Sequence, residues 1–273
     1  MFLCDSHFHT VNSFDGHNTL DEICSRALSL SFCELAVTDH CDIDDILDGI
    51  YPAYDEGAIN EAVAAAREKY AGRLVVSHGI ELGQAHLRQK ESEALLERTP
   101  HDFVLGSIHN LPDVPDFSFL KFERMSQPIY ERLWERSLDE CEKIVKSGLI
   151  DSLAHITYPI RYITRALRPF DMEKYHPRLR EIFGLMIERH VALEVNTSGL
   201  RQGIGFTLPD RSIMELYYRC GGRMVTCGSD AHYARDLGSG IRETYQMLRE
   251  IGFDSITVFH RRKPVSVKIG DDE

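Results

Sequence analysis

The stretch FLCDSHFH, residues 2–9, places a short apolar run directly before two histidines that are one residue apart. The run Phe2-Leu3-Cys4 indicates a buried β-strand, and Asp5-Ser6-His7-Phe8-His9 follows it. In an extended chain the side chains at positions i and i+2 point to the same side, so both imidazoles can hold one cation. The stretch therefore predicts a strand that ends in a metal-type motif.

The same arrangement recurs along the chain. Five further apolar runs lead into a histidine, aspartate or glutamate: 34–38 into Asp39 and His40, 74–77 into Glu81, 103–106 into His109, 150–154 into His155, and 224–227 into Asp230 and His232. A single histidine after a strand is more often a hydrogen-bonded structural residue than a ligand. Six strands with the same ending favour one shared metal site instead.

Apolar runs alternate with stretches of helical spacing over the whole chain. Two more runs complete the strands, 192–195 and 256–259, and the helical stretches are 19–31, 56–70, 87–97, 128–146, 175–189, 209–219 and 241–251. Side chains from six strands converge only if the strands curl around a common axis, which favours a closed or nearly closed α/β barrel over an open doubly wound sheet. No Pro/Gly/Ser-rich linker divides the chain, so we expect one domain over residues 1–273.

Composition narrows the classes of partner. Lys+Arg 31 against Asp+Glu 43 gives a formal net charge of -12, which repels a polyanion, so we expect no nucleic-acid binding. The seven cysteines have no framework spacing, which indicates reduced thiols and a cytoplasmic protein. No stretch approaches the roughly 18 apolar residues of a membrane helix, so we expect neither export nor a membrane.

The combined motifs resemble those of the PHP (polymerase and histidinol phosphatase) family of metal-dependent phosphoesterases. The resemblance rests on Asp5-Ser6-His7-Phe8-His9, Thr38-Asp39-His40, Gly79-Ile80-Glu81, Ser107-Ile108-His109, His155 and Ser229-Asp230-Ala231-His232. These motifs occur in the family's order and span residues 5 to 232. The resemblance implies a distorted (β/α)7 TIM-like barrel with three divalent metal ions at the carboxyl ends of its strands.

The resemblance also implies individual metal ligands. They are His7, His9, Glu81 and Asp230 for the first ion, Glu81 with His109 and His155 for the second, and Asp15, His40 and His232 for the third. In many relatives a histidine stands where this chain has Asp15, so the third set departs from the pattern. Nitrogen and oxygen donors suit Zn, Fe or Mn better than Mg or Ca. We expect Cys4, Cys41 and Cys227, which flank the motifs, to be buried rather than ligating.

This donor set predicts phosphate chemistry. Three divalent cations bring +6 and the carboxylates of Asp15, Glu81 and Asp230 bring -3, which leaves a pocket of about +3 for a phosphate dianion. Two metals roughly 3.5–4 Å apart can share a hydroxide that attacks phosphorus. We therefore expect a phosphomonoesterase that acts on a small-molecule phosphate ester. The resemblance to histidinol phosphatases implies hydrolysis of L-histidinol phosphate to L-histidinol and phosphate, in histidine biosynthesis, by a metal-bridging hydroxide.

Further residues are candidates for contact with the substrate. Arg161 and Arg201 are expected in loops that open on the metal face, where a guanidinium can fork onto phosphate oxygens. In the family's histidinol phosphatases, arginines in these two loops look like phosphate clamps. The acidic stretch Asp42–Asp45 could pair with a cationic amine or imidazolium, but a solvated helix start is the favoured interpretation. Asp42 or a metal-bound water is a candidate proton donor to the leaving group.

Three alternatives stay open. Another small-molecule phosphoesterase on the same scaffold, for example one acting on a nucleotide bisphosphate, would need the same motifs. A Ser-His-Asp hydrolase built from Ser229, Asp230 and His232 is disfavoured, because these residues are too close in sequence and no GxSxG motif occurs. A barrel that binds metal without turnover is disfavoured because all nine ligand positions are filled. We interpret the remaining histidines as surface or core residues: His17, His78, His86, His101, His176, His190 and His260.

Overall fold

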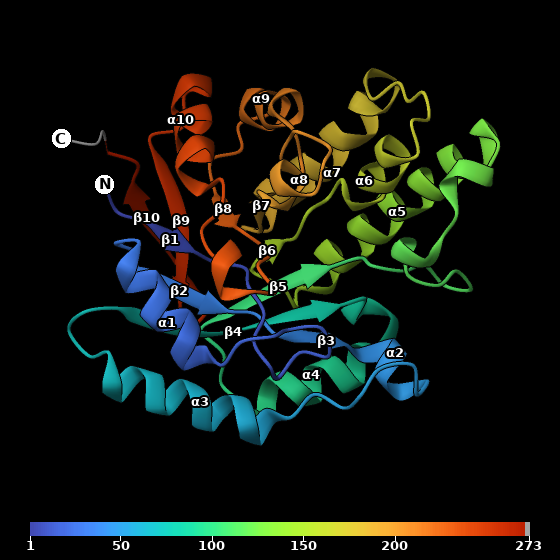
Figure 1. Cartoon of the computed structure of the whole chain (residues 1–273). Helices are drawn as coiled ribbons and strands as arrows, with labels where there is room; N and C mark the ends of the chain where they lie inside the picture. The colour runs from blue at the N-terminus through green and yellow to red at the C-terminus, as the bar shows by residue number, and fades with distance from the viewer. Residues whose placement is uncertain (271–273) are drawn as a thin grey trace.

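A computed structural model describes residues 1–270 and shows parallel strands rolled into a nearly closed barrel (Figure 1). The barrel strands, in their order around the sheet, are β1 (Cys4–Asp5), β2 (Glu34–Val37), β4 (Val75–Gly83), β5 (Phe103–Ser107), β6 (Ser152–Leu153), β7 (Ala192–Asn196) and β8 (Val225–Gly228). A short strand, β3 (His40–Asp42), pairs with the second half of β4. The predicted distorted (β/α)7 barrel is thus confirmed.

Main-chain hydrogen bonds between the first and last strands close the barrel. The amide of Ser6 donates to the carbonyl of Cys227 at 2.9 Å, and the amide of Asp230 donates to the carbonyl of His7 at 2.7 Å. A parallel bridge pairs Phe8 with Ala231 just beyond the strand ends. The segments that close the barrel therefore carry motifs that the sequence analysis assigned to the metal site.

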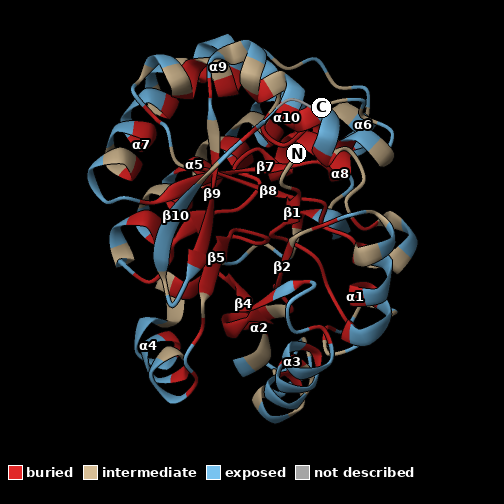
Figure 2. Ribbon diagram, turned by 90° about the vertical axis from the view of Figure 1, so that its left-hand side faces the viewer, coloured by how far each residue is buried: buried red, intermediate tan, exposed pale blue. Residues whose placement is uncertain are grey.

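Helices surround the barrel. They are α1 (Leu20–Ser29), α2 (Ile43–Leu47), α3 (Glu56–Lys69), α4 (Gln89–Arg98), α5 (Gln127–Ser147), α6 (Tyr158–Arg165), α7 (His176–Glu188), α8 (Ser198–Arg201), α9 (Arg211–Arg219) and α10 (Ile241–Ile251). Their ends follow local chemistry: Thr19 and Glu22 form a capping box before α1, and Gly148 ends α5 in the left-handed conformation. Figure 2 shows the strands buried at the centre and the exposed helix faces on the outside.

The inner and outer faces of the strands differ in chemistry. In β7, Leu193 and Val195 point outward and belong to the large apolar core between strands and helices. Ala192, on the other face, belongs to a small apolar cluster inside the barrel, together with Phe103. Glu194 and Asn196 share that inward face by the two-residue period of a strand, and both are buried. The barrel interior is therefore apolar at its floor and polar near the carboxyl ends of the strands.

A two-stranded hairpin covers the floor of the barrel. The predicted strand 256–259 exists, but it lies in β9 (Ser255–His260), which pairs antiparallel with β10 (Lys263–Lys268) outside the barrel sheet. Phe259 packs into the inner cluster, with its ring centroid 5.2 Å from that of Phe103. Arg262 donates from Nε to both carboxylate oxygens of Asp151, at 3.0 and 2.9 Å. The sequence did not reveal β10, because most of its residues are exposed and its sequence KPVSVK contains no continuous apolar run.

Two further expectations concern the membrane and the cysteines. Over residues 1–270, none of the helices combines the length and the apolar character needed to cross a bilayer. All seven cysteines are free thiols, as predicted. Cys4 and Cys227 are fully buried, and burial raises the pKa of the Cys4 thiol to about 12.

We predict that Phe259→Ala lowers the free energy of unfolding by about 3–5 kcal/mol, because it removes a buried aromatic ring from the barrel floor and leaves a cavity. Urea unfolding followed by circular dichroism measures this change. Val265→Ala, on the exposed face of β10, is the control and should change stability by no more than about 0.5 kcal/mol. Equal effects of the two variants would mean that the hairpin does not anchor the barrel.

Candidate metal centre

All nine predicted ligands lie at the carboxyl end of the barrel, where they form one group of neighbouring side chains, here called the ligand cluster. His7 and His9 follow β1, Asp15 lies in the loop before α1, His40 begins β3, Glu81 lies in β4, His109 follows β5, His155 follows β6, and Asp230 and His232 follow β8. Six of the nine are buried, and the other three, Asp15, His40 and His232, are partly exposed. The expected convergence of side chains from separate strands is therefore present.

Glu81 lies at the middle of the ligand cluster. Its Oε1 is 3.1 Å from Nε2 of His109 and 3.1 Å from Nε2 of His155. Its Oε2 is 3.4 Å from Nε2 of His7 and 2.8 Å from Nδ1 of His40. Each carboxylate oxygen thus faces a different pair of imidazoles, which is the arrangement that a bridging ligand needs.

Asp230 forms a second centre on the other side of His7. Its Oδ1 lies 3.4 Å from Nε2 of His9 and 3.8 Å from Nε2 of His7. The Nε2 atoms of these two histidines are only 3.2 Å apart, so the His-x-His motif does direct both rings to one point. Asp230 has a positive φ of 54°, a conformation that few residues other than glycine adopt.

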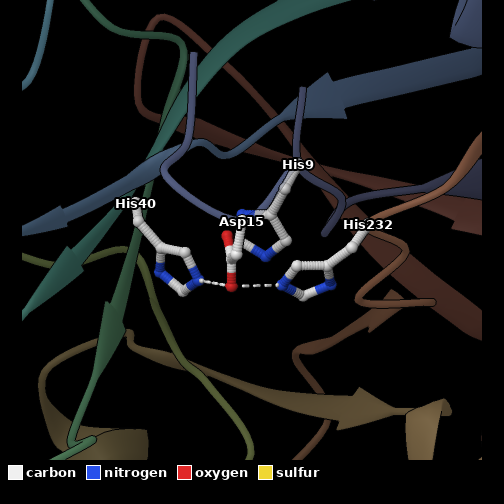
Figure 3. A group of neighbouring side chains, drawn as sticks. All are labelled: His9, Asp15, His40 and His232. Atoms are coloured by element: carbon white, nitrogen blue, oxygen red, sulfur yellow. Dashed lines mark ion pairs between the residues drawn. The ribbon is translucent and has the colours of Figure 1, made fainter. Parts of the chain in front are cut away.

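Asp15 joins the ligand cluster at its exposed edge (Figure 3). Its Oδ2 lies between two imidazoles, 2.9 Å from Nε2 of His232 and 3.7 Å from Nε2 of His40. The ring of His9 stacks on that of His40, with the centroids 4.1 Å apart. A carboxylate therefore lies in the third set and contacts the expected partners.

The donor atoms fit a metal. Four overlapping groups each bring three or more donors within 4.8 Å of one another: His9, Asp15, His40 and His232; His7, His9 and Asp230; His7, Glu81 and His155; and His40, Asp42 and His109. Buried oxygens in these groups, Glu81 Oε2 and Asp42 Oδ2, accept no hydrogen bond from residues 1–270. A buried carboxylate oxygen without a partner is costly unless a cation satisfies it.

The electrostatics of the cluster favour cations as well. Burial would raise the pKa of Glu81, but the charges of His40 and His7 hold it well below its usual range. Burial, together with the charges of His40 and His232, lowers the pKa of His9 to about 3. The Glu81 carboxylate is therefore held ionised and the His9 imidazole neutral, which are the forms that bind metal. The neighbouring carboxylates raise the pKa of the other imidazoles, His7, His40, His109 and His232, so a metal ion would compete with protons there.

Carboxylates behind the cluster hold its histidines in place, and the sequence analysis did not assign them this role. Asp42 Oδ1 lies 2.7 Å from Nδ1 of His109, and Glu194 Oε1 lies 2.6 Å from Nδ1 of His7. Asp39 accepts a hydrogen bond from Ser13 Oγ at 2.9 Å, and Ser13 in turn contacts Nδ1 of His9. One signal was available, because Glu194 is a charged residue inside the apolar run 192–195.

The acidic stretch Asp42–Asp45 starts a helix, as expected, but it is not solvated. Asp44 and Asp45 are buried, and the side-chain amide of Asn110 donates to both of them, at 3.2 and 3.1 Å. The side-chain amide of Gln84 donates to Asp42 and Asp44. Because these amides satisfy the carboxylates, the stretch stays inside the protein next to the ligand cluster.

A cavity of about 810 Å³ opens above the ligand cluster and is lined by both predicted arginines. The expectation that they lie in loops is wrong, since Arg161 lies in α6 and Arg201 ends α8. The helix α6 begins at Tyr158, close behind His155. Pro159 lies in its first turn, a position where proline is compatible with a helix. Arg161 is only 6% exposed, and its Nη2 donates to Ser198 Oγ at 2.7 Å and lies 3.4 Å from Asp230 Oδ2.

Arg201 has different partners. Its Nη1 and Nη2 donate to the main-chain carbonyls of Ser229 and Asp230. Arg201 therefore fixes the backbone that carries Asp230, and its side chain also lines the cavity.

None of the seven other histidines belongs to a donor group among the described residues. His17 lines the cavity, but its ring stacks on Tyr233 with the centroids 4.0 Å apart. His86 pairs with Glu140 at 2.6 Å, and His260 pairs with Glu34 at 2.9 Å. Cys4, Cys41 and Cys227 also stay outside the donor groups.

The fold and the cluster together define a class: (β/α) barrel enzymes that gather metal-type side chains at the carboxyl ends of their strands. The family model of the PHP domain matches residues 5–198. The chain belongs to the PHP domain family.

Curated proteins and solved structures resemble the chain over nearly its whole length. A probable histidinol-phosphatase of Thermotoga maritima is 29% identical over 276 residues, which cover 98% of this chain and 100% of that protein. The histidinol-phosphatase of Lactococcus lactis subsp. lactis is 22% identical, over 95% of both chains. A crystal structure of histidinol phosphate phosphatase from the same organism, complexed with zinc, L-histidinol and phosphate, has a TM-score of 0.82 at 20% identity and covers 96% of this chain and 98% of that one.

We predict that Glu81→Gln sharply reduces the metal content of the purified protein, because it removes the charge from the one carboxylate that contacts imidazoles of four strands. Inductively coupled plasma mass spectrometry measures metal per chain. Glu34→Gln is the control, since Glu34 is equally buried and pairs with His260 at the opposite end of the barrel. Metal content near that of the wild type in Glu81→Gln would contradict a central role for Glu81.

Proposed function

We propose that the chain hydrolyses L-histidinol phosphate to L-histidinol and phosphate, with three divalent cations in the ligand cluster. The observation that carries this proposal is the placement of a buried guanidinium, Arg161, beside Asp230 of the cluster in one cavity. Such a site combines metal donors with a fixed cation for a phosphate group. The relatives named as histidinol-phosphatases support this choice of substrate.

The cations would be Zn, Fe or Mn, held by nitrogen and oxygen donors. We assign the ligands as the family resemblance implies: His7, His9, Glu81 and Asp230; Glu81, His109 and His155; and Asp15, His40 and His232. The donor groups found in the structure overlap with all three sets and add Asp42 next to His40 and His109.

When bound, the cations would supply activated water and neutralise the phosphoryl oxygens. Asp42 and Glu194 contact the imidazoles directly, in addition to the three carboxylates among the ligands. Three divalent cations carry +6 and five carboxylates carry -5, which leaves about +1 rather than the +3 expected from the ligands alone. Arg161 adds a further positive charge, so the site balances a phosphate dianion.

Hydrolysis forms one bond from water oxygen to phosphorus and breaks the bond from phosphorus to the alcohol oxygen. The alcohol oxygen must then gain a proton. Asp42 is our candidate for this transfer: it lines the cavity, and its Oδ2 is one of the buried carboxylate oxygens without a hydrogen bond. It would take the proton released by the attacking water and pass it to the leaving oxygen.

The rest of the cavity suits a cationic, aromatic leaving group. Asp116 lines the cavity and accepts a hydrogen bond from Tyr158 Oη at 3.2 Å. Phe14 and Tyr51, also in the lining, stack with their centroids 4.2 Å apart. An ammonium or imidazolium can pair with the carboxylate, and an aromatic ring can stack at this wall.

The net charge of -12 argues against a nucleic-acid substrate, because a polyanion would be repelled outside the arginine-lined cavity. The free thiols suit the reducing cytoplasm. We therefore place the reaction in that compartment, on a small phosphate ester.

The test is phosphate release from L-histidinol phosphate by protein loaded with Zn, Mn or Fe, together with metal content per chain. We expect about three metals per chain and faster turnover of L-histidinol phosphate than of a nucleotide bisphosphate or a simple alkyl phosphate. Preference for the nucleotide bisphosphate would favour the alternative phosphoesterase. One metal or none, without turnover, would favour a non-catalytic barrel.

We predict that Arg161→Ala raises KM about 10- to 100-fold, because it removes a charge-assisted hydrogen bond worth roughly 1.5–3 kcal/mol. Steady-state kinetics measure this change, and metal content shows whether the ligand cluster is intact. The control is Arg132→Ala on the exposed side of α5, which should leave KM unchanged. Unchanged KM in Arg161→Ala with full metal content would remove Arg161 from the substrate site.

A further inference from the structure

β7 supplies none of the nine ligands, yet its inward side chains reach the ligand cluster. Glu194 is only 1% exposed. Each of its two carboxylate oxygens contacts one residue, and these two residues follow different strands of the barrel. Oε1 lies 2.6 Å from Nδ1 of His7, which follows β1, and Oε2 accepts the main-chain amide of His155, which follows β6, at 2.8 Å. One side chain thus joins two predicted ligands that are 148 residues apart in the sequence.

We propose that Glu194 is a positioning residue for the metal centre, one that fixes the ring tautomer of His7 and the backbone of His155 at the same time. The inference rests on the proposed function only in that the cluster binds metal. It does not depend on which phosphate ester is the substrate.

The double role requires a carboxylate. A carboxylate can only accept hydrogen bonds, so Oε2 accepts from the main-chain amide of His155 and Oε1 requires an N–H group on Nδ1 of His7. A glutamine offers one acceptor and one NH₂ donor, and therefore satisfies either His7 or His155 but leaves the other facing a donor. A buried donor without an acceptor costs about 1–3 kcal/mol.

The ring of His7 has a second neighbour that would favour the wrong tautomer. Asn196 Nδ2 lies 3.5 Å from His7 Nδ1, and Asn196 Oδ1 already accepts from the amide and hydroxyl of Ser198. The amide of Asn196 therefore turns its NH₂ group toward His7. The contact with Glu194 is shorter by 0.9 Å and carries a charge, so it prevails and keeps the proton on Nδ1.

This proton position matters for metal binding. With the proton on Nδ1, the lone pair of His7 is on Nε2, the atom that lies 3.4 Å from Glu81 and 3.8 Å from Asp230. With the proton on Nε2, an N–H group would point into the cluster and the ligand would be lost. A partner of this kind behind a ligating histidine is a general device for setting its orientation and basicity.

Glu194 also stabilises an unfavourable backbone conformation at His155. His155 has a positive φ of 20°, and its main-chain amide donates a hydrogen bond to Glu194 Oε2. Gly228 of β8 makes room for the pair, since a Cβ at this position would lie 2.1 Å from Cβ of His7 and 2.7 Å from Oε1 of Glu194. The neighbouring strand is thus built around the contact between His7 and Glu194.

The experiment compares Glu194→Gln with the wild type and with Glu140→Gln. Glu140 is a matched control, because it is a buried glutamate whose carboxylate lies 2.6 Å from His86 and outside the cluster. Zinc affinity is measured by competition with a chromogenic chelator. The tautomer of His7 is read from ¹⁵N NMR of histidine-labelled zinc-free protein at a pH high enough for the imidazole to be neutral, because the charges of Glu194 and Glu81 outweigh burial and raise the pKa of His7 well above its usual value. His7→Gln is used to assign its signals. Neither readout requires a substrate.

We expect Glu194→Gln to bind zinc about 10- to 100-fold more weakly than the wild type and to move the His7 proton from Nδ1 to Nε2. Glu140→Gln should change neither quantity. If Glu194→Gln does not fold, Glu194→Asp takes its place; its shorter carboxylate reaches one partner only, and it should weaken zinc binding in the same direction.

Two results would overturn the proposal. One is wild-type zinc affinity in a folded Glu194 variant with the His7 proton still on Nδ1. The other is equal loss of affinity in Glu194→Gln and Glu140→Gln, which would indicate a general effect on folding. Failure to hydrolyse L-histidinol phosphate, with the zinc and tautomer results as expected, would reject the proposed substrate and leave the role of Glu194 intact.

Discussion

The hydrogen-bonded seam between the first and last barrel strands is the constraint on which the rest of the structure depends. Beyond the ends of β1 and β8, the chain continues in parallel contact, and these residues include His7, His9 and Asp230. If the sheet were open, these side chains would lie at its two far edges. Closure brings them within hydrogen-bonding distance of one another, so the geometry of the ligand cluster is a consequence of the barrel rather than of any local motif.

Gathering so many ionisable groups inside a barrel is costly, and the structure offsets the cost with partners of opposite or complementary character. Behind the imidazoles stand Asp42, Asp39 with Ser13, and Glu194. They determine which ring nitrogen faces the cluster, as such partners generally do for metal-binding histidines. Some buried carboxylates of this chain therefore orient imidazoles, in addition to the carboxylates that are proposed as metal ligands.

The sequence predicted the alternation of strands and helices, the barrel and the convergence of side chains from six strands, because each of these has a local or periodic signal. The full set of nine ligands, Asp15 included, came from the resemblance to the PHP family. Motifs such as His7-Phe8-His9 are visible without a partner. The role of Glu194 could not be seen in the sequence, since it depends on a contact with His7, which is near the other end of the chain. The same holds for Arg161: its sequence indicated a rim loop, but the helix after His155 buries it against Ser198.

The sequence-based predictions failed at elements whose burial does not follow from the polarity of their residues. β10 is a mostly exposed strand in which polar residues interrupt the apolar ones, so it lacks the apolar run that identifies β9. The acidic start of α2 looked like a solvated helix end, yet Asn110 and Gln84, which are distant in sequence, satisfy its carboxylates. In both cases a tertiary contact overrode the local signal.

Because the floor of the barrel is packed, substrate and products can reach or leave the ligand cluster from one end of the barrel only. Phe259 and its apolar neighbours fill the interior beneath the cluster, and the cavity opens at the other end. An alcohol and a phosphate ion formed in this cavity must leave through the same opening by which the phosphate ester enters. Whichever of the two is held more tightly obstructs the next ester molecule. Under the proposed role of Arg161 and the ligand cluster in binding phosphate, the rate of the cycle would depend on how firmly they retain this anion.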